Sequence, residues 1–345
     1  MKKYRVGILG ATGTVGQRFA QLLEDHPQFE ITALAASDRS AGKAYSEACA
    51  WKLPGKIPAN VRDIVVTPIE PPLDCDIVFS SLPSSVARET EEAFARAGYP
   101  VLSNSSSYRM DEDVPLLIPE INADHLGLIE KQKANRGFAK GFIVTNPNCA
   151  VVSFAPPLAA LHRKFGVESV IVTTLQAISG AGYPGVASLD ITDNVFPYIA
   201  GEEPKVETEA QKILGVFTES GVQKADFTVS AQCFRVNVVD GHMASVRVNL
   251  KQTATLEEVV DAMRTFPSLD LHSSPARFID VTDEPSRPQT RLDRDNGNGM
   301  TITVGRVFPD TVYDYRFVAL SHNTVRGAAG CAILNAELLI SRGMI

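Results

Sequence analysis

The spacing of hydrophobic and polar positions changes character partway along the chain. Early on, short apolar runs alternate with segments in which apolar residues recur every three or four positions. A run at 4–9 leads through a glycine-rich stretch at 10–16 into a helical pattern at 17–26 and a second run at 29–37. Apolar runs predict buried strands and the 3.6-residue period predicts a helix, so the chain opens with a strand–helix–strand unit.

The same alternation continues to about residue 148. Apolar runs at 74–82, 99–106 and 141–148 read as further strands, and an amphipathic helix at 85–98 ends in Gly98. Strands that alternate with helices predict a parallel sheet covered on both faces. We therefore expect an α/β domain of the Rossmann type.

After residue 150 the strands become long and rich in β-branched residues, at 167–179, 227–239 and 242–252, with a helix at 254–266. Long strands of this composition, with one helix among them, predict an α+β domain with a mostly antiparallel sheet. A helix of small residues near the end of the chain could pack back on the first domain. The expected division is a nucleotide-binding domain at 1–148 plus 325–345 and a catalytic and dimerisation domain at 149–324.

Composition narrows the class of partner. With 345 residues, 44% of them hydrophobic, the chain can build two cores. Its net charge is −7, and no block of Lys or Arg interrupts the sequence, which argues against nucleic acid or an anionic membrane as partner. A small molecule fits better. The five cysteines are odd in number and lack a C-x-x-C pair, so we expect no disulfide framework, no metal site and a reducing, cytoplasmic compartment.

A glycine loop directly follows the first strand. Gly10, Gly13 and Gly16 have the spacing G-x-x-G-x-x-G at the start of a helix, where free backbone amides can hold a pyrophosphate. An ordinary glycine turn is the alternative, but the position in a strand–helix–strand unit favours dinucleotide binding. The expected cofactor contacts are Gly10, Thr12, Gly13, Thr14 and Val15.

The end of the second strand indicates which dinucleotide. An NAD enzyme usually places an acid there for the ribose hydroxyls, whereas here Ser37 holds that position. Arg39 with Ser37 and Ser40 can meet a 2′-phosphate, which favours NADP. Alternatively, Asp38 could be the acid that binds the ribose hydroxyls, placed one residue further along the chain, or the segment could be a solvated turn.

A cysteine follows the Asn146–Pro147–Asn148 turn and opens an apolar segment. At a helix start, Cys149 would meet unpaired amides and the positive end of the dipole, both of which favour thiolate. A nucleophile is therefore plausible, although a lone cysteine is more often a packing residue. The proton carrier is either His242, which follows a Gly turn at a strand start, or His322, at the entrance of the last helix; the other four histidines are expected in surface helices or loops.

Several motifs follow one another along the chain: GATGTVGQ, SNSSSYRM, TNPNCAVV, LQAISGAGYPG, ETEAQKI, an arginine seven residues before His242, LDRDNGNGM and HNTVRGAAG. As an ordered set they resemble the aspartate-β-semialdehyde dehydrogenase family, in its archaeal and fungal branch, and the resemblance implies the fold of glyceraldehyde-3-phosphate dehydrogenase. The resemblance implies that Cys149 is the nucleophile, His242 the acid/base and Gln176 the residue that orients the carbonyl. Arg235 would clamp the substrate carboxylate, where a surface salt bridge is the plain alternative.

The resemblance also implies the remaining contacts. Arg109 with Asn104 would bind phosphate, and Glu209 with Lys212, one helical turn apart, would contact the substrate; without the resemblance these helix charges would be read as solvated. The nicotinamide would lie against residues that could otherwise be loop turns, namely Ser179, Gly180, Gly182, Asn323 and Thr324.

The implied activity is NADP-dependent reduction of L-aspartyl-4-phosphate to L-aspartate-4-semialdehyde and phosphate through a cysteine thioester, in the biosynthesis of lysine or diaminopimelate, threonine, methionine and isoleucine. Malonyl-CoA reductase on the same scaffold is the main alternative, N-acetyl-glutamyl-phosphate reductase a weaker one, and a non-catalytic NADP-binding sensor a remote one. Strands of the second domain could continue across a two-fold axis, so we expect a homodimer or homotetramer.

Overall fold

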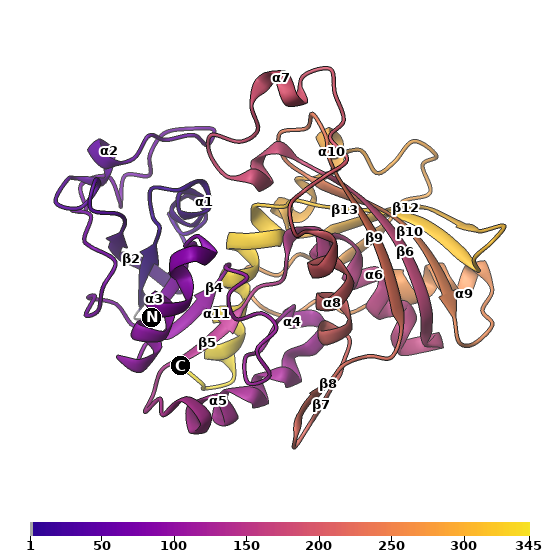
Figure 1. The fold of residues 1–345 in the computed structure, drawn as a ribbon, viewed down its shortest axis with the longest axis horizontal. Helices are drawn as coiled ribbons and strands as arrows, with labels where there is room; N and C mark the ends of the chain where they lie inside the picture. The colour runs from indigo at the N-terminus through magenta and orange to yellow at the C-terminus, as the bar shows by residue number, and fades with distance from the viewer. Residues whose placement is uncertain (1–2) are drawn as a thin grey trace. The chain divides into compact units, whose positions relative to one another are not determined.

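The computed structural model describes residues 3–345 and is drawn in Figure 1. Two compact units divide these residues. Unit 1 contains the chain up to Leu117 together with Asp124–Asn146 and Ala328–Ile345, and unit 2 contains Ile118–Ala123 and Pro147–Gly327. The short segment Ile118–Ala123 thus belongs with unit 2, although the sequence pattern placed it inside the first domain.

Unit 1 is built on a parallel five-stranded sheet in the order β2-β1-β3-β4-β5. Strands β3, β4 and β5 are buried along their whole length, as expected when helices cover both faces of a parallel sheet. The strands are β1 (Tyr4–Leu9), β2 (Phe29–Ala35), β3 (Ile77–Ser80), β4 (Pro100–Ser103) and β5 (Phe142–Thr145), and the helices are α1 (Thr14–Leu22), α2 (Tyr45–Ala48), α3 (Ser84–Arg96), α5 (Leu128–Arg136) and α11 (Gly330–Ser341).

The order of these strands fixes where a ligand can bind. From β1 the chain continues to β2 on one side, and β3 lies on the other, so the direction of winding reverses between β1 and β3. At such a point the loops beyond the carboxyl ends of the strands separate and leave a crevice for a nucleotide. The glycine loop follows β1 and begins at this reversal.

Unit 2 is built on a mixed six-stranded sheet in the order β11-β12-β13-β10-β6-β9. Strands β12, β13, β10 and β6 pair antiparallel, whereas β9 and β11 join the two edges in parallel. The strands are β6 (Val167–Gln176), β9 (Thr228–Arg235), β10 (His242–Leu250), β11 (Ile279–Val281), β12 (Ile302–Pro309) and β13 (Tyr315–Ser321), with a separate hairpin of β7 (Val216–Thr218) and β8 (Gly221–Gln223); the helices are α4 (Pro119–Asn122), α6 (Cys149–Phe165), α7 (Ser188–Ile191), α8 (Glu203–Ile213), α9 (Leu256–Arg264) and α10 (Thr290–Asp293).

The two faces of this second sheet differ. Strand β10 alternates strictly between buried and partly exposed residues, so only one of its faces is packed. Helices α6 and α9 contact the sheet and each other on the packed side, and α8 lies against the edge strand β9 (Figure 1). The other face keeps its side chains partly exposed.

The expectation of a Rossmann-type α/β domain followed by an α+β domain is confirmed.

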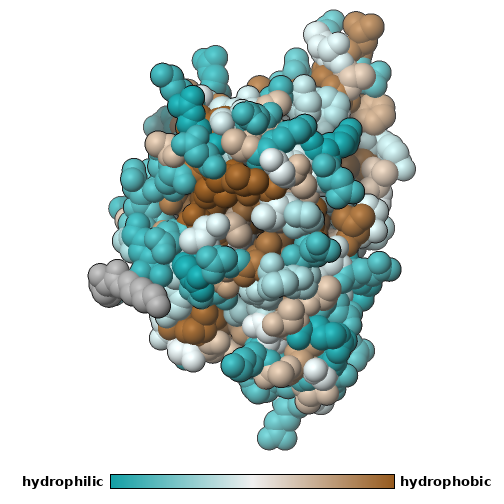
Figure 2. Space-filling model, turned by 90° about the vertical axis from the view of Figure 1, so that its left-hand side faces the viewer, coloured by the Kyte–Doolittle hydropathy of each residue, from teal (hydrophilic) through white to brown (hydrophobic). Residues whose placement is uncertain are grey.

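On the face drawn in Figure 2, most of the surface residues are hydrophilic, and hydrophobic residues form smaller groups among them. Among residues 3–345, none of the helices combines the length and the apolar character needed to cross a bilayer.

Candidate active site

The glycine loop of unit 1 is shaped by steric limits at two glycines. Gly10 has a φ of 77°, and a Cβ on it would lie 3.0 Å from the carbonyl oxygen of Ser81. A Cβ on Gly16 would lie 2.4 Å from the carbonyl oxygen of Gly10, so only glycine lets α1 begin this close to β1. The loop therefore fits a dinucleotide pyrophosphate at the helix N-terminus. The other predicted contacts in the loop are partly exposed at Thr12, Thr14 and Val15 and exposed at Gly13.

Two buried side chains, which sequence reasoning missed, donate hydrogen bonds to main-chain carbonyl oxygens of this loop. The Gln17 amide donates hydrogen bonds to the carbonyl oxygens of Thr12 at 3.0 Å and Ala50 at 3.2 Å. The Tyr45 hydroxyl donates to the carbonyl oxygen of Ala11 at 2.9 Å. A glutamine on α1 and a tyrosine at the start of the short helix α2 carry no sequence signal for this role.

The loop after β2 presents a cation to solvent. Ser37, Asp38 and Arg39 are exposed and Ser40 is half-buried. The Ser40 amide donates to the carbonyl oxygen of Ser37 at 2.8 Å, which closes a turn. The Arg39 guanidinium and the two hydroxyls can thus approach an anionic group on a ribose.

Arg109 and Asn104 lie together in unit 1, after β4. The Arg109 guanidinium donates to the carbonyl oxygen of Asn104 at 2.8 Å, and the Asn146 amide donates to Asn104 Oδ1, also at 2.8 Å. Asn335, on α11, donates in turn to Asn146 Oδ1 at 2.7 Å. Asn146 and Asn335, which sequence reasoning left without a role, therefore fix the asparagine that holds Arg109.

In unit 2, Cys149 is the first residue of α6 and is partly exposed. Asn148 caps the helix, because its Oδ1 accepts hydrogen bonds from the amides of Ala150 at 2.8 Å and Val151 at 3.4 Å. A thiol in this first turn lies at the positive end of the helix dipole, which favours the thiolate. Gly327 approaches closely, since a Cβ on it would lie 2.7 Å from the Cβ of Cys149.

Arg235 ends β9 and is buried. Its guanidinium donates to the carbonyl oxygen of Ala177 at 2.7 Å. Burial lowers the pKa of Arg235, and the nearby Cys149 and Glu202 act in the opposite direction, as anionic groups do. The arginine and the thiol are thus within electrostatic reach of each other.

His242 begins β10 and is fully buried. The amide of Ala177 donates to its Nδ1 at 3.0 Å, which places the proton of the neutral ring on Nε2. Among residues 3–345, Nε2 has no hydrogen-bond partner. Burial, followed by the charges of Arg235 and His322, lowers the pKa of His242 to about 3. The ring is therefore a neutral donor with a proton available at Nε2.

Ala177 and Gly180 bring these two side chains together. The main chain of Ala177 accepts from Arg235 and donates to His242, so one residue orients both. A Cβ on Gly180 would lie 3.0 Å from Arg235 Nη1 and 3.1 Å from His242 Nε2. Gly180 consequently leaves just enough room for the guanidinium and the imidazole to share one site.

Asn323 braces the same site. Its Nδ2 donates to the Ser179 hydroxyl at 2.8 Å, and its Oδ1 accepts from the amide of Gly241, the residue before His242, also at 2.8 Å. Thr324 is buried beside it, and Gly182, with a φ of 71°, has open space around its Cα.

His322, the alternative proton carrier, is buried next to this brace. Its Nδ1 accepts from the amide of Thr324 at 3.4 Å, and its Nε2 lies 3.7 Å from a carboxylate oxygen of Asp295. These contacts hold the ring to Thr324 and to the segment that follows α10. His242, in contrast, shares Ala177 with Arg235.

Gln176 and the α8 pair are buried rather than solvated. The Gln176 amide donates to the Thr174 hydroxyl at 3.2 Å. Glu209 and Lys212 are 1% and 3% exposed, and a Glu209 carboxylate oxygen accepts from the amide of Asn148 at 2.6 Å. Glu209 therefore contacts the residue that precedes the nucleophile, which excludes the reading of this pair as ordinary surface charges.

A buried ion pair supports the chain beside Cys149. Arg326 is fully buried, makes a bidentate pair with Glu120 at 2.9 and 2.6 Å, and lies over the Phe278 ring. Arg326 precedes Gly327 within a π-helical turn at Val325–Ala329. Such turns are frequent at functional sites. The pair anchors the turn that brings Gly327 against the thiol.

Two of the histidines expected at the surface are not there. His26 is 4% exposed and lies 2.9 Å from a Glu337 carboxylate oxygen, and His125 is fully buried. His26 lies in the connection between α1 and β2, and His125 lies within the 3-10 helix Ala123–Gly127. The local sequence pattern does not reveal that these segments are buried.

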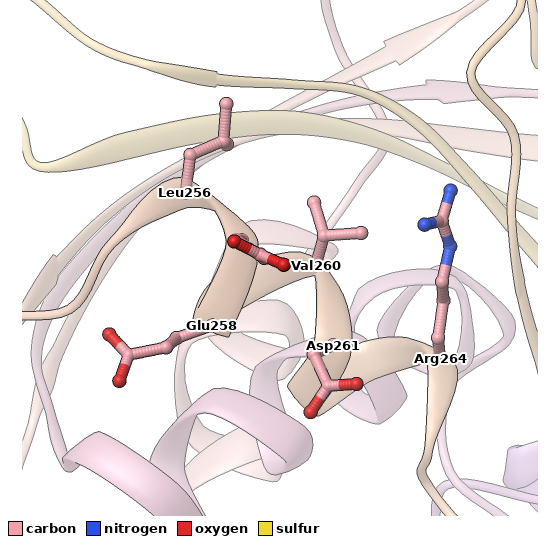
Figure 3. A pocket seen from close by; sticks show the side chains of 6 residues that line it. Leu256, Glu258, Val260, Asp261 and Arg264 are labelled. Atoms are coloured by element: carbon pink, nitrogen blue, oxygen red, sulfur yellow. The ribbon is translucent and has the colours of Figure 1, made fainter.

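Elsewhere the described residues suggest no further chemistry. Between residues 3 and 345, no group of three or more His, Cys, Asp or Glu side chains could hold a metal ion. A hollow on α9 carries acidic side chains and Arg264 (Figure 3), but Glu258 serves the helix capping box and Arg264 pairs with Asp283. This surface is a solvated helix face.

The chain matches a known family in both units. Residues 5–129 match the NAD binding domain of semialdehyde dehydrogenases, and residues 158–326 match their dimerisation domain. The chain is 53% identical to the aspartate-semialdehyde dehydrogenase of Archaeoglobus fulgidus over 99% of this chain and 100% of that one. It is 50% identical to the enzyme of the same name from Aspergillus fumigatus, over 99% of each chain.

Solved structures agree. The crystal structure of aspartate semialdehyde dehydrogenase with NADP from Candida albicans is 41% identical, covers 100% of both chains and superposes with a TM-score of 0.91. Aspartate semialdehyde dehydrogenase II from Vibrio cholerae, complexed with ASA, is 26% identical over 99% of both chains with a TM-score of 0.78.

Proposed function

Because this chain belongs to the aspartate-semialdehyde dehydrogenase family, we propose that it catalyses the NADP-dependent reductive dephosphorylation of L-aspartyl-4-phosphate to L-aspartate-4-semialdehyde. One observation carries the proposal beyond the family name. A cysteine at a helix N-terminus, a buried arginine and a neutral histidine with an available Nε2 proton meet in one unit. These groups are what acyl transfer through a thioester requires.

The first step is attack by the Cys149 thiolate on the acyl carbon. The carbon–sulfur bond forms, the bond to the phosphate oxygen breaks, and phosphate leaves with its electron pair. The dipole of α6 and the charge of Arg235 stabilise the thiolate before it attacks. Arg235 also holds the α-carboxylate of the substrate by a planar fork that lysine lacks.

His242 acts on the oxygen of the reacting carbonyl. Its Nε2–H donates a hydrogen bond to the oxyanion at each tetrahedral stage and shares its proton with the thiohemiacetal oxygen. When this proton returns to Nε2, the oxygen becomes the aldehyde carbonyl, the carbon–sulfur bond breaks, and the Cys149 thiolate is restored. Because the Ala177 amide occupies Nδ1, the ring is held in the tautomer that can donate. Gln176 orients the carbonyl on the same side of the site.

The residues that would hold NADP are those of the glycine loop, the loop after β2 and the 179–182 turn. When bound, NADPH supplies the hydride for reduction of the acyl carbon. In unit 1, Gly10 to Val15 receive the pyrophosphate, and Arg39 with Ser37 and Ser40 receive the 2′-phosphate. In unit 2 the nicotinamide contacts are Ser179, Gly180, Gly182, Asn323 and Thr324.

Substrate phosphate is assigned to Arg109 with Asn104, and the remaining polar contacts to Glu209 and Lys212. Support comes from the burial of these charges and from the asparagine network that fixes Asn104. A charge held this way is preorganised for an anionic group. With the full set in place, the chain would catalyse a step in the biosynthesis of lysine or diaminopimelate, threonine, methionine and isoleucine.

The alternatives have no comparable support. Full-length relatives from archaea and fungi carry the name aspartate-semialdehyde dehydrogenase, and none of the features of the site calls for a coenzyme A thioester. A non-catalytic NADP sensor would have no need of a preorganised thiol, arginine and imidazole.

The chain would act as a homodimer or homotetramer. The second unit matches a dimerisation domain, and one face of its sheet is only partly covered. Exposed large apolar residues also gather in one segment of this unit, which is typical of a subunit interface. They are Tyr183, Leu189, Val195, Phe196 and Tyr198. The five free thiols fit a cytoplasmic enzyme.

The test is phosphate-dependent reduction of NADP with aspartate semialdehyde, beside oxidation of NADPH with malonyl-CoA. We expect the first reaction and not the second. A Cys149→Ala variant should lose turnover and retain NADP binding. Phosphate-dependent turnover by this variant, or activity of the wild type with malonyl-CoA alone, would contradict the proposal.

A further inference from the structure

Two carboxylates, Glu202 just before α8 and Glu209 in its second half, hold the residue before the nucleophile. Asn148 donates its main-chain amide to Glu209 at 2.6 Å and its side-chain Nδ2 to Glu202 at 2.8 Å. Asn148 and Glu202 are both 6% exposed. Glu202 directly precedes α8 and was not singled out by sequence reasoning, because it reads as one of several helix charges.

The contact with Glu202 fixes which way the Asn148 amide faces. An ionised carboxylate can only accept hydrogen bonds, so the NH₂ group must point to Glu202. The oxygen of the same amide then points to Ala150 and Val151, whose N–H groups it caps. A flipped amide would place NH₂ against these N–H groups and an oxygen against the carboxylate. Glu202 thereby selects the amide orientation in which Asn148 caps the start of α6 at Cys149.

We propose that Glu202 is a positioning residue that acts through the side-chain amide of Asn148 to fix the helix end carrying the Cys149 thiol. The chemical purpose of this placement rests on the function proposed above. Small displacements of a nucleophile cost rate rather than ground-state binding. The loss of Glu202 should therefore reduce kcat and leave KM and cofactor affinity nearly unchanged.

The other contact of Glu202 is a weak competitor for this role. Lys205 Nζ lies 3.4 Å from the second carboxylate oxygen, and the Lys205 side chain is 37% exposed. Partly exposed pairs of this kind contribute little. Glu202 also opposes the effect of burial on Arg235, which places it in the surroundings of the arginine as well as of Asn148.

Neighbouring residues supply matched variants. Glu202→Ala removes the acceptor, and Glu202→Gln keeps an oxygen that can still accept from Asn148. Glu203→Ala is the control, because Glu203 lies next to Glu202 and holds a backbone amide of Cys233 instead, at 3.2 Å. Lys205→Met tests the ion pair alone.

In steady-state assays, Glu202→Ala should lower kcat about 10-fold with KM within about two-fold of the wild type. Glu202→Gln should recover most of this loss, and Glu203→Ala and Lys205→Met should have little effect. An alanine variant that matches the Glu203→Ala control, or equal losses in the alanine and glutamine variants, would overturn the proposal.

A second measurement does not depend on the substrate. Asn148→Ser keeps a good helix cap but has no NH₂ group to meet Glu202. Alkylation of Cys149 by iodoacetamide should change in rate when Glu202→Ala is made in the wild type and should not change further in the Asn148→Ser background. Equal effects in both backgrounds, or none in either, would overturn the positioning role. If the wild type lacks the proposed dehydrogenase activity, this alkylation cycle still decides the question.

Discussion

The buried imidazole of His242 makes acid stability the clearest physical prediction. Its pKa is lowered from the ordinary value of 6.5 to about 3, chiefly by burial. Between these two values the unfolded chain binds a proton that the folded chain does not. Stability contributed by the neutral ring is therefore present above pH 6.5 and is lost as pH falls towards 3.

The size of the effect follows from the proton count. One extra proton taken up on unfolding changes the free energy of unfolding by about 1.4 kcal/mol per pH unit. Between pH 6 and pH 4 this one residue should remove roughly 2 to 3 kcal/mol of stability. A His242→Gln variant cannot take up this proton and should lack that share of the acid dependence.

Urea unfolding of the wild type and the His242→Gln variant at half-unit steps from pH 7 to pH 4 measures this difference. All other titrating groups are common to both proteins and cancel to first order. We expect the two stability curves to converge as pH falls, with the wild type losing more. Parallel curves over this range would refute the reasoning that the ring is held neutral by its surroundings.

Three further substitutions test other parts of the account. Glu91 accepts hydrogen bonds from two buried serines, and burial raises its pKa to about 7. The free energy of unfolding of the wild type should therefore fall as pH rises from about 4.5 to 7. In urea unfolding at pH 8, Glu91→Gln should be more stable than the wild type by up to about 3 kcal/mol, with little difference at pH 4.5. Gly180→Ala should lower kcat at least about 10-fold with little change in Tm, because the new Cβ would lie about 3 Å from Arg235 and His242 and displace both. Arg235→Lys should raise KM for aspartate semialdehyde at least about 10-fold, since lysine lacks the planar fork, while leaving NADP affinity near that of the wild type in a fluorescence titration.

Strand and helix periodicity predicted all five strands of the first sheet and three strands of the second, β6, β9 and β10, but missed β11, β12 and β13. The run at 4–9 is β1, and 242–252 contains β10. Boundaries were less accurate: the helix predicted at 17–26 is α1 at Thr14–Leu22, because the glycine loop lets the helix begin within it. Helix α6 continues through Pro156 and Pro157, which local propensity argues against. The packing of this almost fully buried helix offsets the backbone hydrogen bonds that the two prolines remove.

A residue of the candidate site could be predicted from the sequence only where its side-chain type is characteristic of its chemical role. Cys149, Arg235 and His242 have such signatures, and the structure brings them together in unit 2. Glu202, Ala177 and the buried Asn146–Asn335 contact have none, because their roles depend on tertiary contacts between distant segments. Ala177 acts through its main chain alone, so no side-chain pattern could have marked it.

The central claim is that a thioester forms on Cys149, and one experiment tests it directly. Wild-type enzyme mixed with NADP and aspartate semialdehyde, with phosphate omitted, should produce one equivalent of NADPH and then stop, since no phosphate is present to release the acyl group. Peptide mass spectrometry should place the aspartyl group on Cys149. A burst with no adduct, or an adduct on a different residue, would contradict the account.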